Sequence, residues 1–201
     1  MLEGNYENKY ESRGIFSKHF VGSFLKSLDY LIKVVENEIL SINEIGCGEG
    51  YLTRHIRRNF QGELRGCDYS KNIIQRAREL SRGQDILFYQ KSIYKLGGQD
   101  RADMLVCCEV LEHLECPEEA LSRLAETADR YVILSVPREP VWRMLNMIRM
   151  KYTRHLGNTP GHLQHWSRGR FIKFIEDRLE IVSESSPFPW IMMLCRKRKK
   201  G

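Results

Sequence analysis

The sequence has no hydrophobic run near the ~18 residues of a membrane-spanning helix, no internal repeat and no low-complexity segment. These absences exclude a membrane span, a solenoid and a disordered chain. Met1–Tyr6 are polar and acidic, so we expect no secretory leader and a cytoplasmic protein. The 201 residues, 42% hydrophobic and 29% charged, suit a single globular domain.

The cysteines lack the spacing of a metal or disulfide framework. None forms a C-x-x-C pair, and no histidines stand at zinc-finger spacing. We therefore expect reduced thiols, with those in or beside strands acting as small buried hydrophobes, and no metal site. The six cysteines are Cys47, Cys67, Cys107, Cys108, Cys116 and Cys195.

Positive charge is concentrated at the end of the chain. The net charge is +6, of which residues 196–200 supply +5, and the remaining chain carries 27 basic against 26 acidic residues. A nucleic-acid-binding fold more often carries basic residues across its surface. We expect no nucleic-acid partner, and at most a weak contact of the basic tail, residues 196–201, with anionic surfaces.

Glycines alternate in the segment that runs from Glu44 through Gly46 and Gly48 to Gly50. Such a loop lets a ligand lie close to the backbone, and the N–H groups of a following helix would face that ligand. The dinucleotide fingerprint needs a third glycine at position 51, which is Tyr51, and the Gly-Lys of a phosphate loop is absent. A nicotinamide oxidoreductase is therefore disfavoured, and a glycine-rich turn without a ligand is the structural alternative.

Strand-like and helix-like segments alternate along the chain, which predicts a parallel sheet with helices on both faces. Two closing strands around a short turn predict an antiparallel hairpin at the sheet edge. The fold class is therefore α/β, a Rossmann-like, seven-stranded, mostly parallel sheet. The predicted helices are 17–37, 51–60, 70–80, 116–128, 141–152 and 168–178, and the strands are 42–45, 63–67, 86–90, 103–108, 131–136, 179–184 and 190–195.

Three motifs occur in order: E-x-G-x-G-x-G, then Asp68 after the second strand, then Cys107–Leu114 after the fourth. Together they resemble the motifs of class I S-adenosylmethionine (SAM) dependent methyltransferases. Within that family the chain is similar to the ubiquinone-biosynthesis branch. The resemblance implies SAM as cofactor, S-adenosylhomocysteine (SAH) as product, and methyl transfer to an oxygen of a small molecule, ahead of nitrogen or carbon.

Cofactor contacts are expected around these motifs. An acid after the second strand can accept both ribose hydroxyls. The family often has an acid near position 92, where this chain has Ser92, so adenine recognition would use that hydroxyl or the backbone of Ile93. The full set implied by the resemblance is Tyr10, Arg13, Glu44, Gly46, Cys47, Gly48, Gly50, Asp68, Tyr69, Ser92, Ile93, Glu109 and Val110.

The acceptor side is expected beyond the fifth strand, in an insertion at 138–166, while residues 1–37 form a lid and first helix. His113 and His162 are candidate general bases, and Arg138, Arg143, His165 and Trp166 are candidate acceptor contacts. Structural hydrogen bonding by the histidines, and packing of Trp166 on the last helix, remain open alternatives.

A second hypothesis comes from another class of function. The chain would keep the fold and bind SAM, but act as an interaction module through a partner. The sequence leaves a monomer and a dimer equally open.

Overall fold

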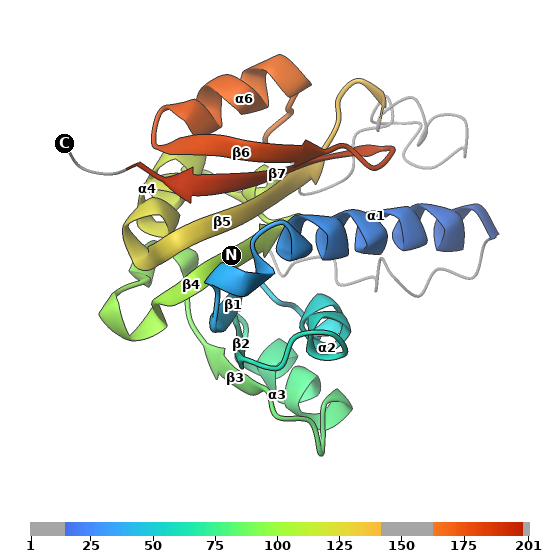
Figure 1. The fold of residues 1–201 in the computed structure, drawn as a ribbon, viewed down its shortest axis with the longest axis vertical. Coiled ribbons are helices and arrows are strands. Elements are labelled where there is room, and N and C mark those ends of the chain that lie inside the picture. The colour runs from blue at the N-terminus through green and yellow to red at the C-terminus, as the bar shows by residue number, and fades with distance from the viewer. Residues whose placement is uncertain (1–14, 142–162, 199–201) are drawn as a thin grey trace.

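A computed structural model describes residues 15–141 and 163–198. In this part of the chain seven strands form one sheet in the order β3-β2-β1-β4-β5-β7-β6 (Figure 1). The strands β1 to β5 are parallel, β7 runs antiparallel to β5, and β6 runs antiparallel to β7. The bounds are β1 Ser41–Ile45, β2 Glu63–Asp68, β3 Leu87–Gln90, β4 Ala102–Cys108, β5 Ala128–Pro137, β6 Leu179–Ser185 and β7 Trp190–Lys197. The predicted fold class is confirmed, including the closing hairpin.

The helix α1 precedes β1, and the other described helices lie between strands along the chain, largely as the sequence predicts. Their bounds are α1 Ile15–Lys33, α2 Tyr51–Arg57, α3 Lys71–Leu80, α4 Pro117–Thr127 and α6 Arg168–Glu176, with short 3-10 turns η1 Glu36–Glu38, η2 Ile93–Lys95, η3 Gly98–Asp100 and η4 Leu111–His113. The predicted helix 141–152 falls outside the described residues beyond its first position.

Local sequence signals set three of the helix starts. Ser70 and Ser167 adopt extended backbone conformations, and their side chains accept hydrogen bonds from the third residues of α3 and α6. Each serine thereby satisfies a backbone donor that the helix itself leaves unpaired. Pro117 occupies the first position of α4, where its missing N–H costs nothing.

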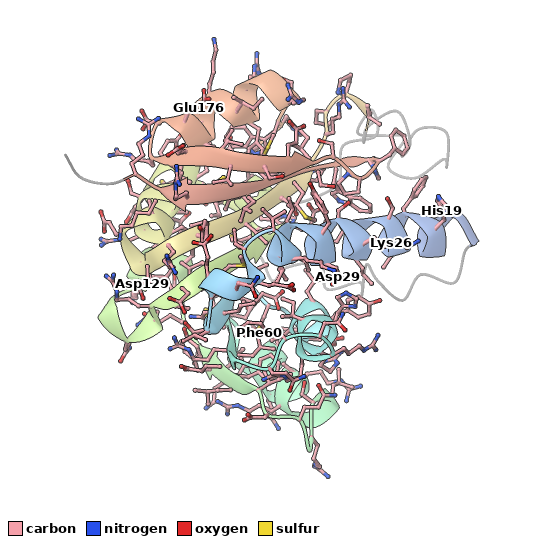
Figure 2. All side chains as sticks on the ribbon, viewed as in Figure 1. His19, Lys26, Asp29, Phe60, Asp129 and Glu176 are labelled. Atoms are coloured by element: carbon pink, nitrogen blue, oxygen red, sulfur yellow. The ribbon has the colours of Figure 1, made fainter. Side chains whose placement is uncertain are left out.

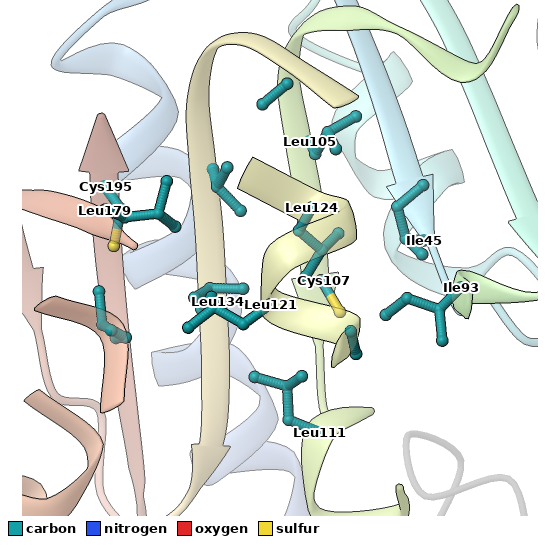
Figure 3. Packing of buried hydrophobic residues seen from close by; sticks show 14 of the residues in the cluster. Ile45, Ile93, Leu105, Cys107, Leu111, Leu121, Leu124, Leu134, Leu179 and Cys195 are labelled. Atoms are coloured by element: carbon teal, nitrogen blue, oxygen red, sulfur yellow. The ribbon is translucent and has the colours of Figure 1, made fainter. Parts of the chain in front are cut away.

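The core has two layers, one on each face of the sheet. On one face α4 and α6 contribute Leu121, Leu124, Phe171 and Ile175 to a cluster with the central strands (Figure 3). On the other face α1 and α2 pack on residues that alternate with those of the first cluster. Figure 2 shows Asp29 of α1 beside α2, where its Oδ1 lies 2.8 Å from His55 Nε2. The sheet is thus covered on both faces, and in open α/β sheets of this kind ligands bind outside the carboxyl ends of the strands.

The cysteines and the basic C-terminal run also have defined places in the fold. All six cysteines are free, and all except Cys116 are buried. The strand β7 continues through Arg196 and Lys197, which bind Glu180 and two carbonyl oxygens respectively, so the basic run begins inside the sheet. Among the described helices, none is both long and apolar enough to cross a membrane.

Candidate functional site

The glycine loop between β1 and α2 depends on glycine at three positions. Gly46, Gly48 and Gly50 have φ angles of 77°, 53° and 75°, in the region that disfavours side chains. A Cβ at Gly46 would lie 2.4 Å from Val110 Cγ2, and one at Gly50 would lie 2.7 Å from Phe88 Cζ. A Cβ at Gly48 would meet no atom within 4 Å. The loop is packed at both ends and open in the middle, where a ligand can contact its backbone.

Asp68 lies beside that open position, at the end of β2. Its Oδ2 accepts a hydrogen bond from Gly48 N at 3.2 Å, and its Oδ1 accepts one from Ser70 N at 2.9 Å. The side chain is nearly buried, and this burial raises the pKa of the carboxyl, while the backbone donors Ser70 and Gly48 oppose the rise. The carboxylate is therefore held in a fixed orientation at the edge where a ribose would bind.

Glu44 lies beneath the loop. It is buried, and Thr53 Oγ1 on α2 donates a hydrogen bond to its Oε2. Burial raises the pKa of this carboxyl to about 8, so it is mainly protonated at neutral pH. In the structure Glu44 joins the end of β1 to the first turn of α2, which orients the helix N-terminus toward the loop.

The segment after β3 is attached to Asp68 through Lys91. The Lys91 N–H donates to the Asp68 carbonyl oxygen at 2.9 Å, while Lys91 Nζ lies 3.1 Å from Oδ2 of the fully buried Asp100. Ser92 and Ile93 follow directly, and the Ser92 hydroxyl makes no capping bond to η2. Tyr69, the other adenine candidate, is 58% exposed. The contacts of Lys91 with Asp68 and Asp100 therefore hold this segment on one side, and the side of Ser92 and Tyr69 stays accessible.

Glu109 marks the exit of β4. Among the described residues it is the non-glycine with a positive φ, at 60°. Its N–H donates to the Ser135 carbonyl oxygen at 3.1 Å, and its carboxylate accepts Ser135 Oγ at 3.1 Å and Trp190 Nε1 at 2.7 Å. A strained backbone held by several bonds is typical of functional sites. Sequence reasoning missed Ser135 and Trp190, because no local pattern links them to Glu109.

On the acceptor side, the structure brings the β4 exit next to residues 163–166. The Glu112 carbonyl oxygen accepts hydrogen bonds from Leu163 N at 2.8 Å and Gln164 N at 3.0 Å. His113 Nε2 lies 3.7 Å from Glu112 Oε1, and the His113 side chain is 36% exposed. His113 therefore lies at this edge with one ring nitrogen near a buried carboxylate.

The β5 exit joins the same region. Arg138 pairs with Trp166 in an isolated bridge, and Glu139 N donates to the Trp166 carbonyl oxygen at 2.9 Å. His165 Nδ1 lies 3.6 Å from Glu139 Oε1. The Trp166 ring packs against Phe174, with centroids 4.6 Å apart, as the alternative of packing on the last helix expects. The exposed candidates here are Arg138 and His165.

Four predicted site residues lie outside the described residues, namely Tyr10, Arg13, Arg143 and His162. In residues 15–141 and 163–198, no three His, Cys, Asp or Glu side chains form a group suited to a metal ion.

Residues 43–129, which hold the glycine loop, Asp68 and the β4 exit, match a family model described as a methyltransferase domain. This match and the methyltransferase folds described below support the predicted class I methyltransferase family.

Relatives and solved structures agree with this assignment. The chain is 27% identical over 159 residues to the ubiquinone biosynthesis O-methyltransferase of Alkalilimnicola ehrlichii, covering 70% of this chain and 64% of the relative. It is 22% identical to the malonyl-[acyl-carrier protein] O-methyltransferase of Bacillus anthracis, covering 57% of this chain and 42% of the relative. The chain thus spans less than two thirds of these curated relatives.

Two solved structures establish the fold. The magnesium protoporphyrin IX methyltransferase of Synechocystis PCC 6803 with bound SAH has a TM-score of 0.70 at 20% identity, covering 93% of this chain and 89% of that chain. The N-methyltransferase NodS of Bradyrhizobium japonicum WM9 has a TM-score of 0.67 at 18% identity, covering 90% and 98%.

Proposed function

We propose that this methyltransferase domain transfers a methyl group from SAM to an oxygen atom of a small molecule. The observation that carries the proposal is the open backbone at Gly48 directly beside the buried, oriented Asp68. The methyltransferase domain supports the cofactor, and the two O-methyltransferase relatives support the acceptor atom.

The described residues fit the parts of SAM. The Asp68 carboxylate would accept the ribose hydroxyls, and the backbone of the Gly46–Gly50 loop would lie along the ligand. The Ser92 hydroxyl or the backbone of Ile93 would contact the adenine. Glu109 and Val110, across β1 from Asp68, would meet the amino-acid end. When bound, SAM supplies an activated methyl group on a sulfonium that already carries its leaving group.

The protein's own contribution is then mainly placement. Holding an acceptor in line at near contact distance provides most of the rate gain in such a displacement. A hydroxyl acceptor must also lose a proton, and the exposed His113 is the described candidate for receiving it. Arg138 and His165 would contact the acceptor from the β5 side.

We propose the same chain organisation that the sequence predicts. Residues 1–37 would form the lid and first helix of a single domain, 138–166 the acceptor-side insertion, and 196–201 a basic tail, of which the part beyond β7 would have weak affinity for anionic surfaces. The protein would act as a monomer or dimer in the cytoplasm, and its partner would be the small-molecule acceptor.

A transfer assay with methyl-labelled SAM tests this function. Wild-type protein and an Asp68→Asn variant are incubated with pooled phenols, carboxylic acids and amines, and label is counted in the small-molecule fraction. We expect label in phenols or acids with the wild type and at least a 30-fold lower rate with Asp68→Asn at low SAM, because removing the charge that accepts two hydrogen bonds costs about 2 kcal/mol or more.

A matched control uses Asp129, which lies at the opposite end of the parallel strands (Figure 2). Its carboxylate forms an exposed pair with Arg101, so Asp129→Asn removes the same charge with little effect on stability. Equal loss in both variants, or label in amines alone, would contradict the proposal.

A further inference from the structure

Trp190, the first residue of β7, connects the closing hairpin to the β4 exit. Its Nε1–H donates to Glu109 Oε2 at 2.7 Å, across 81 positions of sequence. Its ring packs edge-on against Phe24 of α1, with centroids 5.1 Å apart, and its backbone pairs with Pro137 of β5. The indole is thus fixed by a helix and by the sheet, and its donor is aimed at a single carboxylate oxygen.

Glu109 needs such support, because a non-glycine residue in the left-handed region costs on the order of 1–3 kcal/mol. The backbone bond from Glu109 N to the Ser135 carbonyl oxygen holds one side of this residue. The side chain is held separately, with Ser135 Oγ donating to Oε1 and Trp190 to Oε2. Both carboxylate oxygens therefore have a donor, one from the parallel strand β5 and one from the antiparallel strand β7.

The position of Glu109 determines the position of Val110. The Val110 side chain fills the space that a Cβ at Gly46 would occupy, with Cγ2 only 2.4 Å from that point. A continuous contact path therefore runs from Trp190 through Glu109 and Val110 to Gly46. A shift at the β4 exit would be felt in the glycine loop, since packed interiors transmit displacements.

The sheet order places this path at one end of the proposed ligand. The strands β2 and β4 flank β1 on opposite sides, so Asp68 and Glu109 lie on either side of the glycine loop. A ligand whose ribose binds Asp68 must extend across the loop toward Glu109. The amino-acid end of SAM or SAH carries an ammonium group, which an oriented carboxylate attracts.

We propose that Trp190 is a positioning residue for the amino-acid end of the cofactor, acting through Glu109. The proposal rests on the proposed function, because it assumes that the glycine loop binds SAM and SAH. The adenosine end depends instead on Asp68 and on Lys91, which anchors the segment after β3.

Calorimetric titration with two probes distinguishes binding of the adenosine end of the cofactor from binding of its amino-acid end. SAH carries the amino acid, whereas 5′-methylthioadenosine shares the adenosine and the sulfur but lacks the amino acid. Trp190→Phe keeps an aromatic ring against Phe24, and it removes the Nε1 donor together with part of the indole ring. We expect this variant to bind SAH about tenfold more weakly, corresponding to one charge-assisted hydrogen bond, and to bind 5′-methylthioadenosine within twofold of wild type.

Equal weakening of both probes, or unchanged SAH affinity, would overturn the proposal. Phe24→Leu is the second variant, since it loosens the packing around the indole without removing a donor, and it should keep SAH affinity within twofold. If the wild type gives no heat with 5′-methylthioadenosine, the test is a comparison of the SAH affinities of Trp190→Phe and Phe24→Leu. Equal losses of SAH affinity in the two variants would refute a positioning role for Trp190. Absence of SAH binding by the wild type would instead refute the proposed function.

Discussion

The buried carboxyl of Glu44 makes stability depend on pH in a direction that can be derived from its environment. Its pKa is about 8 in the folded protein and 4.5 as the ordinary value. Between these values the folded state binds the proton more tightly than the unfolded state, so stability is full at low pH and falls as pH rises. From pH 5 to pH 8 this amounts to roughly 3.5 kcal/mol, at ~1.36 kcal/mol per pH unit with rounding at both ends.

The perturbation that isolates this effect is Glu44→Gln. Glutamine has the shape of a protonated glutamate, and its carbonyl oxygen can still accept the hydrogen bond from Thr53 Oγ1. We expect the variant to match wild type within about 1 kcal/mol near pH 5 and to be more stable by roughly 3 kcal/mol at pH 8.

Urea unfolding followed by tryptophan fluorescence at pH 5, 6, 7 and 8 measures both proteins under the same conditions. All other titrating groups are common to the two, so the difference in unfolding free energy reports Glu44 alone. A difference that stays constant across this range would show that Glu44 is ionised in the folded protein, and the reasoning from burial would be wrong.

Three further predictions concern residues that support the proposed cofactor site. Gly46→Ala should lower stability by about 3 kcal/mol and abolish SAH binding, because the methyl group meets Val110 at a positive φ. Lys91→Met should cost about 3 kcal/mol in urea unfolding, because it leaves the buried Asp100 carboxylate without its cation. Ser70→Ala should cost only about 0.5 kcal/mol, because the cap bond at 3.5 Å is long.

Each of these has a control within the chain. Gly97→Ala meets no atom within 4 Å, so equal losses at Gly97 and Gly46 would exclude the clash as the cause. Lys91→Arg keeps the cation and should lose less than Lys91→Met, and equal losses would contradict the ion-pair argument. A loss above about 2 kcal/mol for Ser70→Ala would mean that Ser70 does more than cap α3.

Features encoded within a few residues could be predicted from the sequence. The glycine loop lies where the sequence predicts it, and the predicted helices 70–80, 116–128 and 168–178 begin within one residue of α3, α4 and α6. The closing hairpin follows from two strand-like runs around a short turn. Each depends on local backbone geometry or periodicity, which a sequence displays directly.

The sequence predicts the ends of helices and strands less well, because the apolar pattern of buried residues does not stop at the residue where the helix or strand stops. The first helix was predicted to Asn37, but it ends at Lys33, and Val35 remains buried beyond it. The strand β5 begins at Ala128, earlier than predicted, because the exposed Asp129 and Arg130 interrupt the apolar pattern without interrupting the strand.

Contacts between distant segments could not be predicted. Trp190 and Glu109 meet only because the antiparallel β7 lies beside β5. The pair of Lys91 with Asp100 depends on how the chain turns between β3 and β4. Such contacts follow from the sheet order, and the pattern around each residue contains no sign of them.

Binding of SAM by the glycine loop and Asp68 is tested most directly by calorimetric titration with SAM and SAH. We expect micromolar binding of both by the wild type and by Asp129→Asn, with at least a 30-fold loss in Asp68→Asn. Absence of heat with both ligands at millimolar concentration would contradict it. The open loop at Gly48 would then be a structural turn, and the alternative of an interaction module would be preferred.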